Sequence, residues 1–181
     1  MRRIGITGGI GSGKSVVSRL LRIMGYSVYD TDSEAKRLME SSLEVVQKLS
    51  ECFGRDIYHN GRLNRGLLSS RVFGESDKIV LLNSIVHPVV RFDFYRWSES
   101  LNEEICFVES AILYESRFDE LVDEVWTVTA PEELRIGRVR QRSGLTEEEI
   151  KKRMAAQLSE EEKQRRAAHI IWNDGNVSVI H

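Results

Sequence analysis

A glycine-rich run near the start of the sequence combines the residue types that hold a triphosphate. Residues 8–15 read GGIGSGKS and match the pattern GxxxxGK[ST]. Glycines let the backbone wrap closely around an anion, so that successive N–H groups point inward. We expect Lys14 to reach the β- and γ-phosphates and the Ser15 hydroxyl to bind Mg²⁺. The expected phosphate-binding residues are Gly8, Gly9, Ile10, Gly11, Ser12, Gly13, Lys14 and Ser15.

The segments on either side of this run fit the same interpretation. Residues 3–7 are an apolar stretch that predicts a buried strand, and residues 16–21 form an amphipathic stretch that predicts a helix. A helix that begins at Lys14 would direct the positive end of its dipole at the bound anion. The strand, loop and helix together predict a site for a nucleoside triphosphate.

Two carboxylates follow the next predicted strand. Residues 26–29 predict a strand that delivers Asp30 and Asp32 to its end. Since the carboxyl ends of parallel strands share one edge of a sheet, we expect both side chains to lie beside the phosphate loop. Asp32 is the predicted general base, which orients an acceptor hydroxyl and takes its proton. The alternative is that one of the two only caps the following helix.

Two arginines late in the chain could act on the transferred phosphate. Arg138 and Arg142 are four residues apart, on one face of a helix predicted to open at Pro131 with Thr129 and Glu132 as a capping box. Such a face could close as a lid over the γ-phosphate, neutralise charge and exclude water. The alternative is a solvated helix held by surface salt bridges.

The remaining pattern predicts an α/β fold of three layers around a central parallel sheet. Apolar runs at residues 105–108, 124–129 and 170–172 predict three further strands. Residues 33–102 are mainly helical, interrupted by a turn at 59–61, with one apolar stripe from Leu38 to Phe53 and another at residues 81–86. We predict a single domain over residues 1–181, with a helical acceptor-binding insertion at about 33–102 and a helical lid at about 131–165.

The composition and net charge limit the kinds of partner that we expect. The chain has 181 residues, 41% hydrophobic and 30% charged, with a formal net charge of −2. This charge gives no basic field for nucleic acid or an anionic membrane, so we expect neither as a partner. No apolar stretch has the length of a membrane span, and we expect a cytoplasmic protein. Cys52 and Cys106 have no disulfide or metal-site spacing.

A nucleotide loop of this kind occurs in switches, motors and small-molecule kinases. The guanine-reading NKxD element and the DxxG switch element are both missing from the sequence. A carboxylate beside the phosphates and an arginine-bearing helix favour a kinase, because a switch has no use for an acceptor base. The residues alone leave open which small molecule is phosphorylated, and a non-catalytic switch stays as the second alternative.

The sequence closely resembles the dephospho-coenzyme A kinase family. The family's motifs appear in order: its glycine-rich opening at residues 5–15, a DADxxAR-like element at 30–36, a Phe-Gly pair at 53–54, GxLxRxxL at 61–68, IxHPxxR closing a helix at 85–91, a PLLFE-like element at 111–115, then Arg138, Arg142, Gln157 and Asn-Asp-Gly at 173–175. The likeness covers almost the whole chain, and the IxHPxxR element with the late arginines makes it specific.

The resemblance implies an activity and a set of site residues. It implies that ATP, with Mg²⁺, phosphorylates the ribose 3′-hydroxyl of dephospho-coenzyme A in the last step of coenzyme A synthesis. It puts Asp32 in the position of the base and adds Val16 and Asn173 to the nucleotide-binding residues. It also implies an acceptor site formed by Asp32, Lys36, Arg65, His87 and Arg91, although a lone histidine is by composition more often a packing residue.

The sequence departs from the family pattern at several positions. Lys36 replaces an arginine and loses bidentate phosphate recognition. The other departures are Val16, Asn83, Ala111, Arg135, Ala168 and an end at His181, where the family pattern continues into a terminal helix. We expect these changes to affect acceptor affinity and C-terminal packing more than the chemistry.

Overall fold

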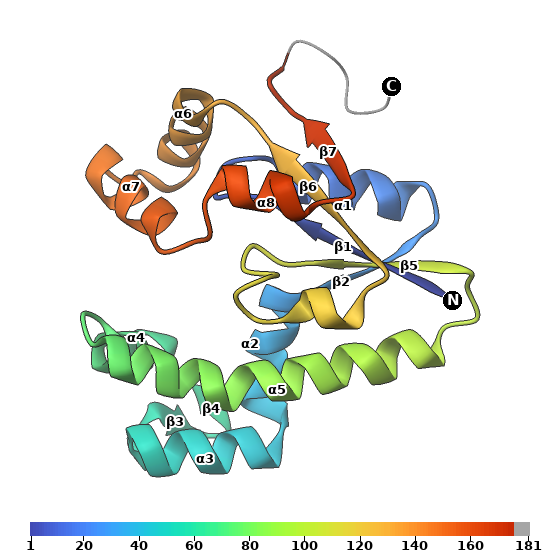
Figure 1. Ribbon diagram of the computed structural model, residues 1–181. Coiled ribbons are helices and arrows are strands. Elements are labelled where there is room, and N and C mark those ends of the chain that lie inside the picture. The colour runs from blue at the N-terminus through green and yellow to red at the C-terminus, as the bar shows by residue number, and fades with distance from the viewer. Residues whose placement is uncertain (176–181) are drawn as a thin grey trace. The chain divides into compact units, whose positions relative to one another are not determined.

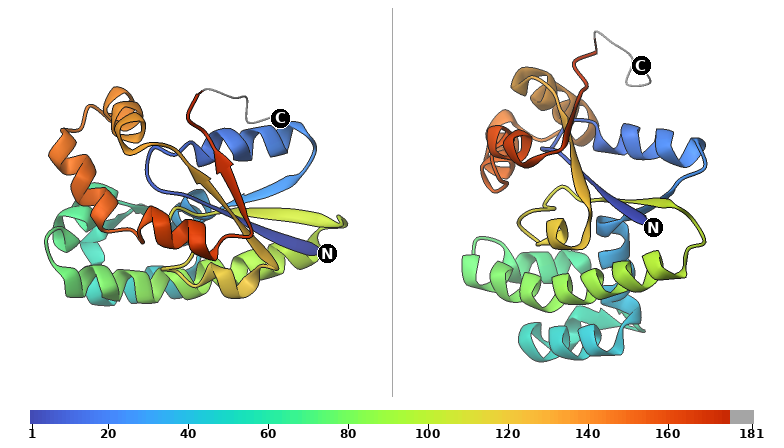
Figure 2. Two further views of the ribbon diagram at one scale, coloured as in Figure 1. Left: turned by 45° about the horizontal axis from the view of Figure 1, so that its top comes forward. Right: turned by 45° about the vertical axis from the view of Figure 1, so that its right-hand side comes forward.

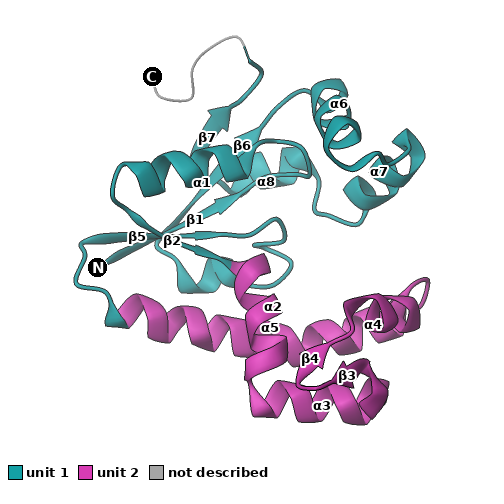
Figure 3. Ribbon diagram, turned by 180° about the vertical axis from the view of Figure 1, so that it is seen from behind, with its two compact units in different colours: residues 1–30, 100–181 teal, residues 31–99 magenta. Residues whose placement is uncertain are grey.

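The computed structural model describes residues 1–175, and residues 176–181, where the C-terminal departure falls, lie outside the described residues. The chain divides into two compact units, unit 1 with residues 1–30 and 100–181 and unit 2 with residues 31–99 (Figure 3). Each unit is described by itself.

Unit 1 is built on a five-stranded parallel sheet with the strand order β2-β5-β1-β6-β7 (Figure 1). The strands are β1 (Arg2–Thr7), β2 (Ser27–Asp30), β5 (Ile105–Glu109), β6 (Glu124–Thr129) and β7 (His169–Trp172). Every neighbouring pair is parallel, so the carboxyl ends of all five strands meet at one edge. The predicted central parallel sheet is confirmed, and each predicted strand is present within two residues of its expected bounds.

The core of unit 1 explains why α1 packs on this sheet. Helix α1 (Lys14–Ile23) buries Val17 and Leu21 against Ile4, Ile6 and other apolar side chains of the strands. These two helix positions lie four residues apart and so share one face. Figure 2 shows α1 and helix α8 (Glu160–Arg166) on opposite faces of the sheet, which gives the predicted three layers.

Three short helices follow β6. They are α6 (Glu132–Ser143), α7 (Glu147–Ala155) and α8, and a 3₁₀ turn (Phe118–Leu121) precedes the strand. A capping box between Thr146 and Glu149 starts α7, because each side chain bonds the other residue's backbone N–H. The capping box predicted between Thr129 and Glu132 is wrong. Thr129 is still part of β6 and Pro131 is the N-cap, because the Thr129 hydroxyl is engaged by Glu160 and Gln164 of α8.

Unit 2 is mainly helical, as predicted. Its elements are α2 (Thr31–Ser41), α3 (Leu43–Phe53), a 3₁₀ turn (Arg55–Ile57), the strands β3 (Tyr58–His59) and β4 (Arg62–Leu63), α4 (Arg65–Val72) and α5 (Ser76–Ser100). The expected turn at 59–61 is a β-hairpin in which Asn60 and Gly61 both have positive φ, at 50° and 76°. The stripe expected from Leu38 to Phe53 is divided between α2 and α3, because the chain turns at Ser42.

Helix α5 corrects one expectation from the family pattern. The IxHPxxR element does not close a helix, since Pro88 lies inside a helix of 25 residues. Proline removes one backbone hydrogen bond, which usually ends or kinks a helix. Val90 and Phe94 are both buried on the far side of the proline, so tertiary packing keeps the helix intact there.

Candidate functional site

The phosphate loop adopts a backbone that requires its glycines. Between β1 and α1, Gly8, Gly11 and Gly13 have φ values of 149°, 81° and 97°. A methyl group on Gly8 would lie 2.1 Å from the Val128 carbonyl oxygen, and one on Gly13 would lie 2.0 Å from Asn173 Nδ2. At Gly8 and Gly13 a side chain is therefore excluded for two reasons, the positive φ of the backbone and the close neighbouring atoms.

Lys14 is the first residue of α1, and its ammonium folds back over the loop. Lys14 Nζ donates to the Gly8 carbonyl at 2.8 Å and to the Gly9 carbonyl at 3.4 Å. Ser15, the next residue, is exposed. The first turn of α1 contains no acidic residue, so no carboxylate of its own neutralises the positive end of this helix.

Arg138 and Asn173 join the loop from two other elements. Arg138 on α6 donates from Nη2 to the Asn173 carbonyl at 2.9 Å and from Nη1 to the carbonyls of Gly11 and Ser12 at 3.5 Å each. Asn173, which follows β7, donates from Nδ2 to the Ser12 carbonyl at 2.9 Å. The structure thus brings both predicted residues to the phosphate loop. Arg142, one turn further along α6, is exposed.

Arg135 supports the loop from the other side, a role that the sequence did not reveal. Its side chain is buried and forms an ion pair with Glu160 of α8 at 3.2 Å. A methyl group on Gly9 would lie 2.2 Å from both Arg135 Nη1 and Glu160 Oε1. The available signal was spacing, since Arg135 is four residues before the buried Val139 and so shares the inward face of α6.

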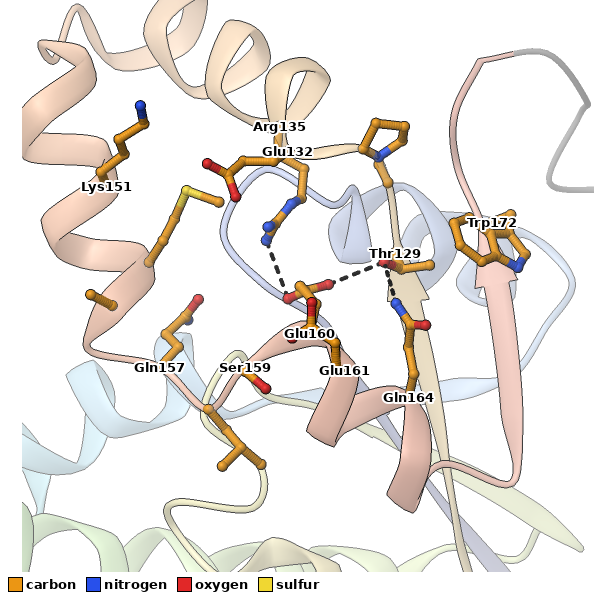
Figure 4. Close-up of a pocket in the computed structure, with 15 residues that line it drawn as sticks. Thr129, Glu132, Arg135, Lys151, Gln157, Ser159, Glu160, Glu161, Gln164 and Trp172 are labelled. Carbon is orange, nitrogen blue, oxygen red and sulfur yellow. Dashed lines mark hydrogen bonds and ion pairs between the residues drawn. The ribbon is translucent and has the colours of Figure 1, made fainter.

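A cavity of about 600 Å³ opens beside this ion pair within unit 1 (Figure 4). The end of β6 and the helices α6, α7 and α8 line it, and Figure 4 shows Arg135 and Thr129 directed at Glu160. Glu160 accepts from Thr129 Oγ1 at 3.1 Å, and Gln164 Nε2 donates to the same hydroxyl at 3.2 Å. Glu160 therefore has two partners, the Arg135 guanidinium and the Thr129 hydroxyl.

The carboxylates predicted near the phosphates divide between the two units. Asp30 ends β2 in register with Glu109, which ends β5 and is itself in register with Ile6 of β1. Asp30 and Glu109 therefore lie at the edge of the sheet where β1 ends and the phosphate loop begins. Asp32 is the exposed second residue of α2, in unit 2.

The predicted acceptor residues all lie on helices of unit 2. Lys36 is exposed on α2, and Arg65 at the start of α4 forms an ion pair with Glu40, one turn after Lys36, at 3.3 Å. His87 and Arg91 are four residues apart on α5. Burial lowers the pKa of His87, and the positive charge of Arg91 lowers it further.

Across residues 1–175, every helix is too short or too polar to cross a membrane.

Comparisons with known proteins agree over nearly the whole chain. A family model described as dephospho-CoA kinase matches residues 2–178. A dephospho-CoA kinase from Porphyromonas gingivalis is 44% identical over 174 residues, which cover 96% of this chain and 86% of that protein. A crystal structure from Thermus thermophilus superposes with a TM-score of 0.83 at 38% identity, covering 97% of this chain and 90% of the other. A dephospho-CoA kinase structure from Campylobacter jejuni gives 0.71 at 26% identity, covering 96% and 89%.

Proposed function

The chain belongs to the dephospho-CoA kinase family, and on that premise we propose that it transfers the γ-phosphoryl group of ATP to the ribose 3′-hydroxyl of dephospho-coenzyme A. The observation that carries the proposal is the phosphate loop, joined by Arg138 and Asn173, in a chain that the family model matches over residues 2–178. The same match does not favour the alternatives of another small-molecule kinase or a nucleotide switch.

The loop geometry supports ATP as the phosphate donor. Gly11 and Gly13 have positive φ and precede a helix whose first turn carries no acid, an arrangement in which backbone N–H groups can be directed at an anion. Lys14 already lies over the loop and would exchange its carbonyl contacts for phosphate oxygens. The residues around the loop are therefore suited to a polyanion. Ile10 and Val16 would line it as part of the nucleotide site.

The same loop fits Mg²⁺. Ser15 carries an exposed hydroxyl directly after Lys14, and a hydroxyl oxygen is a suitable ligand for this hard cation. Bound there, Mg²⁺ would supply charge neutralisation for the phosphates of ATP. Ser15 would hold this ion at the start of α1.

Arg138 and Arg142 would supply charge from the lid, residues 131–165. Arg138 is held by three carbonyl oxygens of the loop region, all of which are weaker partners for a guanidinium than phosphate oxygens. Arg142 lies one turn further along the same helix and would reach the transferred group as the lid closes. Together they would stabilise the charge that develops during transfer.

Unit 2 would bind the acceptor. We place Asp32 as the base that orients the 3′-hydroxyl, because it follows by two residues the strand end at Asp30. Lys36, Arg65, His87 and Arg91 would contact dephospho-coenzyme A, and three of these carry the charge that its phosphates need. The chain would act as one kinase domain over residues 1–181, with an insertion at 33–102, in the cytoplasm.

An ADP-release assay with a panel of acceptors tests the proposal. The purified chain with ATP and Mg²⁺ should release ADP when dephospho-coenzyme A is added, and should not do so with shikimate, gluconate or nucleosides. An analogue of dephospho-coenzyme A blocked at the 3′-hydroxyl should give no ADP. Equal turnover with the blocked analogue would overturn the assignment of the acceptor hydroxyl.

A further inference from the structure

Gln157 contacts the phosphate loop although it lies far from it in the sequence. It occupies the short connection between α7 and α8, where its backbone N–H donates to the Met154 carbonyl at 3.1 Å. Its side-chain Oε1 accepts from the backbone N–H of Ile10 at 3.0 Å, and its Nε2 donates to the Ala111 carbonyl at 3.4 Å. One amide group therefore links the phosphate loop to the segment that follows β5.

The contact at Ile10 falls where the loop has the least conformational restraint of its own. Ile10 lies between Gly9 and Gly11, and glycines restrict the backbone less than any other residue. A hydrogen bond to the Ile10 N–H fixes the plane of the peptide between Gly9 and Ile10. The neighbouring Gly11 is confined by the backbone of Arg135, whose carbonyl oxygen would lie 2.4 Å from a methyl group there.

The connection that carries Gln157 is itself firmly held. The Ala111 carbonyl also accepts from Lys163 Nζ at 3.4 Å, and the Lys163 side chain is fully buried. The next residue after Gln157, Leu158, donates its backbone N–H to Glu115 at 2.6 Å. Two residues of the connection are thus bonded to the segment after β5, so Gln157 has a fixed base from which to hold the loop.

We propose that Gln157 is a positioning residue for ATP: it sets the phosphate loop through the Ile10 N–H and links that loop to the connection between α7 and α8 of the lid. The proposal rests on the assigned nucleotide site and adds a residue that acts on the phosphates through the backbone. Because α6 and α7 lead directly into the connection that holds Gln157, movement of the lid would be transmitted to the loop at this bond.

The variant Gln157→Met tests this role because it keeps the length of the side chain and removes both hydrogen bonds. We expect the dissociation constant for MgATP, measured by calorimetry, to rise about 10-fold, since a peptide N–H loses its partner and the loop loses its restraint. The KM for ATP should rise in parallel, while the KM for dephospho-coenzyme A changes less than about 2-fold. Gln157→Glu keeps an acceptor for the Ile10 N–H and should bind MgATP closer to the wild type than to Gln157→Met.

Gln164→Met is the matched control. Gln164 is the same residue type on α8, lines the same cavity and bonds Thr129 rather than the loop (Figure 4). It should lower the melting temperature about as much as Gln157→Met but leave MgATP affinity within about 2-fold of the wild type.

Equal MgATP affinity in Gln157→Met and Gln164→Met would overturn the proposal, and so would equal loss in the Met and Glu variants at position 157. The calorimetric measurement needs no turnover. If dephospho-coenzyme A proved not to be the acceptor, the assigned activity would fail while the result for Gln157 would stand or fall on its own.

Discussion

The two units present their functional residues in different ways. In unit 1 the phosphate loop works through its backbone, and the side chains around it, Arg138 and Asn173, bond backbone carbonyls. In unit 2 the predicted acceptor residues are charged or titratable side chains on helix surfaces, and Arg65 is tied to another side chain, Glu40. The phosphate loop of unit 1 is thus fixed by main-chain geometry, whereas the proposed acceptor residues of unit 2 offer side-chain charge.

A site built from backbone and a site built from side chains should tolerate substitutions differently. A backbone site fails when a Cβ atom is added, because the neighbouring atoms lie as close as 2.0 Å to where that atom would be. A side-chain site loses one contact at a time, and each loss costs a bounded amount of affinity. Substitutions in the two units should therefore change different kinetic constants.

The largest effect should come from Asp32, the residue that we propose as the base. Asp32→Asn removes the base and should lower kcat by about 10²–10⁴-fold while leaving MgATP affinity near that of the wild type. Steady-state kinetics and calorimetry measure the two quantities. Asp77, an exposed acid in the first turn of α5, is the matched control, and Asp77→Asn should keep full turnover. Full turnover of Asp32→Asn would remove it from the site.

The second-largest effect should come from the phosphate loop of unit 1, where an added methyl group tests whether loop geometry sets the KM for ATP. Gly13→Ala should raise the KM for ATP by about 10²-fold, because the methyl group collides with Asn173 Nδ2 and the residue has a φ of 97°. Gly25 has a φ of 94° at the other end of α1, and no atom of residues 1–175 lies within 4 Å of a methyl group there, so Gly25→Ala shares the backbone cost alone. Its KM for ATP should stay at the wild-type value. Similar values for the two variants would mean that loop geometry does not set ATP affinity.

A smaller effect should appear in unit 2. Arg65→Ala removes one charged contact and should raise the KM for dephospho-coenzyme A about 10-fold without changing the KM for ATP. Lys48→Ala, which breaks a surface ion pair with Glu44 on α3, serves as the comparison and should change neither constant. If Arg65→Ala raised the KM for ATP instead, the division between donor and acceptor units would be wrong.

The smallest effect concerns His87 and pH. Its pKa in the folded protein is lowered from 6.5 by burial and by Arg91, so the unfolded chain binds the proton more tightly. The stability that the neutral imidazole contributes is complete above pH 6.5 and declines as the pH falls towards the lowered value. Urea unfolding midpoints at about pH 7.5 and pH 5.5 should differ less in His87→Gln than in the wild type. The exposed His59 is the control, and an unchanged difference in His87→Gln would contradict the pKa assignment.

The sequence predicted the parts of the fold and site that local physics determines. The loop at residues 8–15 was predictable because glycines, lysine and serine serve one backbone geometry within a single contiguous stretch. Arg135, Gln157 and Glu160 were not assigned roles, because their partners lie in other elements of the fold and local spacing does not identify those partners. The capping box at Thr129 was wrong for a related reason: the local pattern was satisfied, but contacts with α8 took the hydroxyl.

Helix α5, which continues through Pro88, is a second case in which tertiary contacts override a local pattern. A proline usually ends a helix, yet α5 continues because Val90 and Phe94 are buried beyond it. Resemblance to a family reached further than local pattern at Asn173, which the structure brings to the loop from the end of β7. Tertiary contacts of this kind need either a structure or a relative.

The most direct test of the central claim follows the phosphate itself. The purified chain is given Mg²⁺, dephospho-coenzyme A and ATP labelled in the γ-phosphate, and the labelled product is isolated and its phosphate located by phosphorus NMR. We expect the label to appear in coenzyme A, on the 3′-oxygen of the ribose, and Asp32→Asn to form this product far more slowly. Label found only in inorganic phosphate, or on another oxygen of the acceptor, would contradict this expectation.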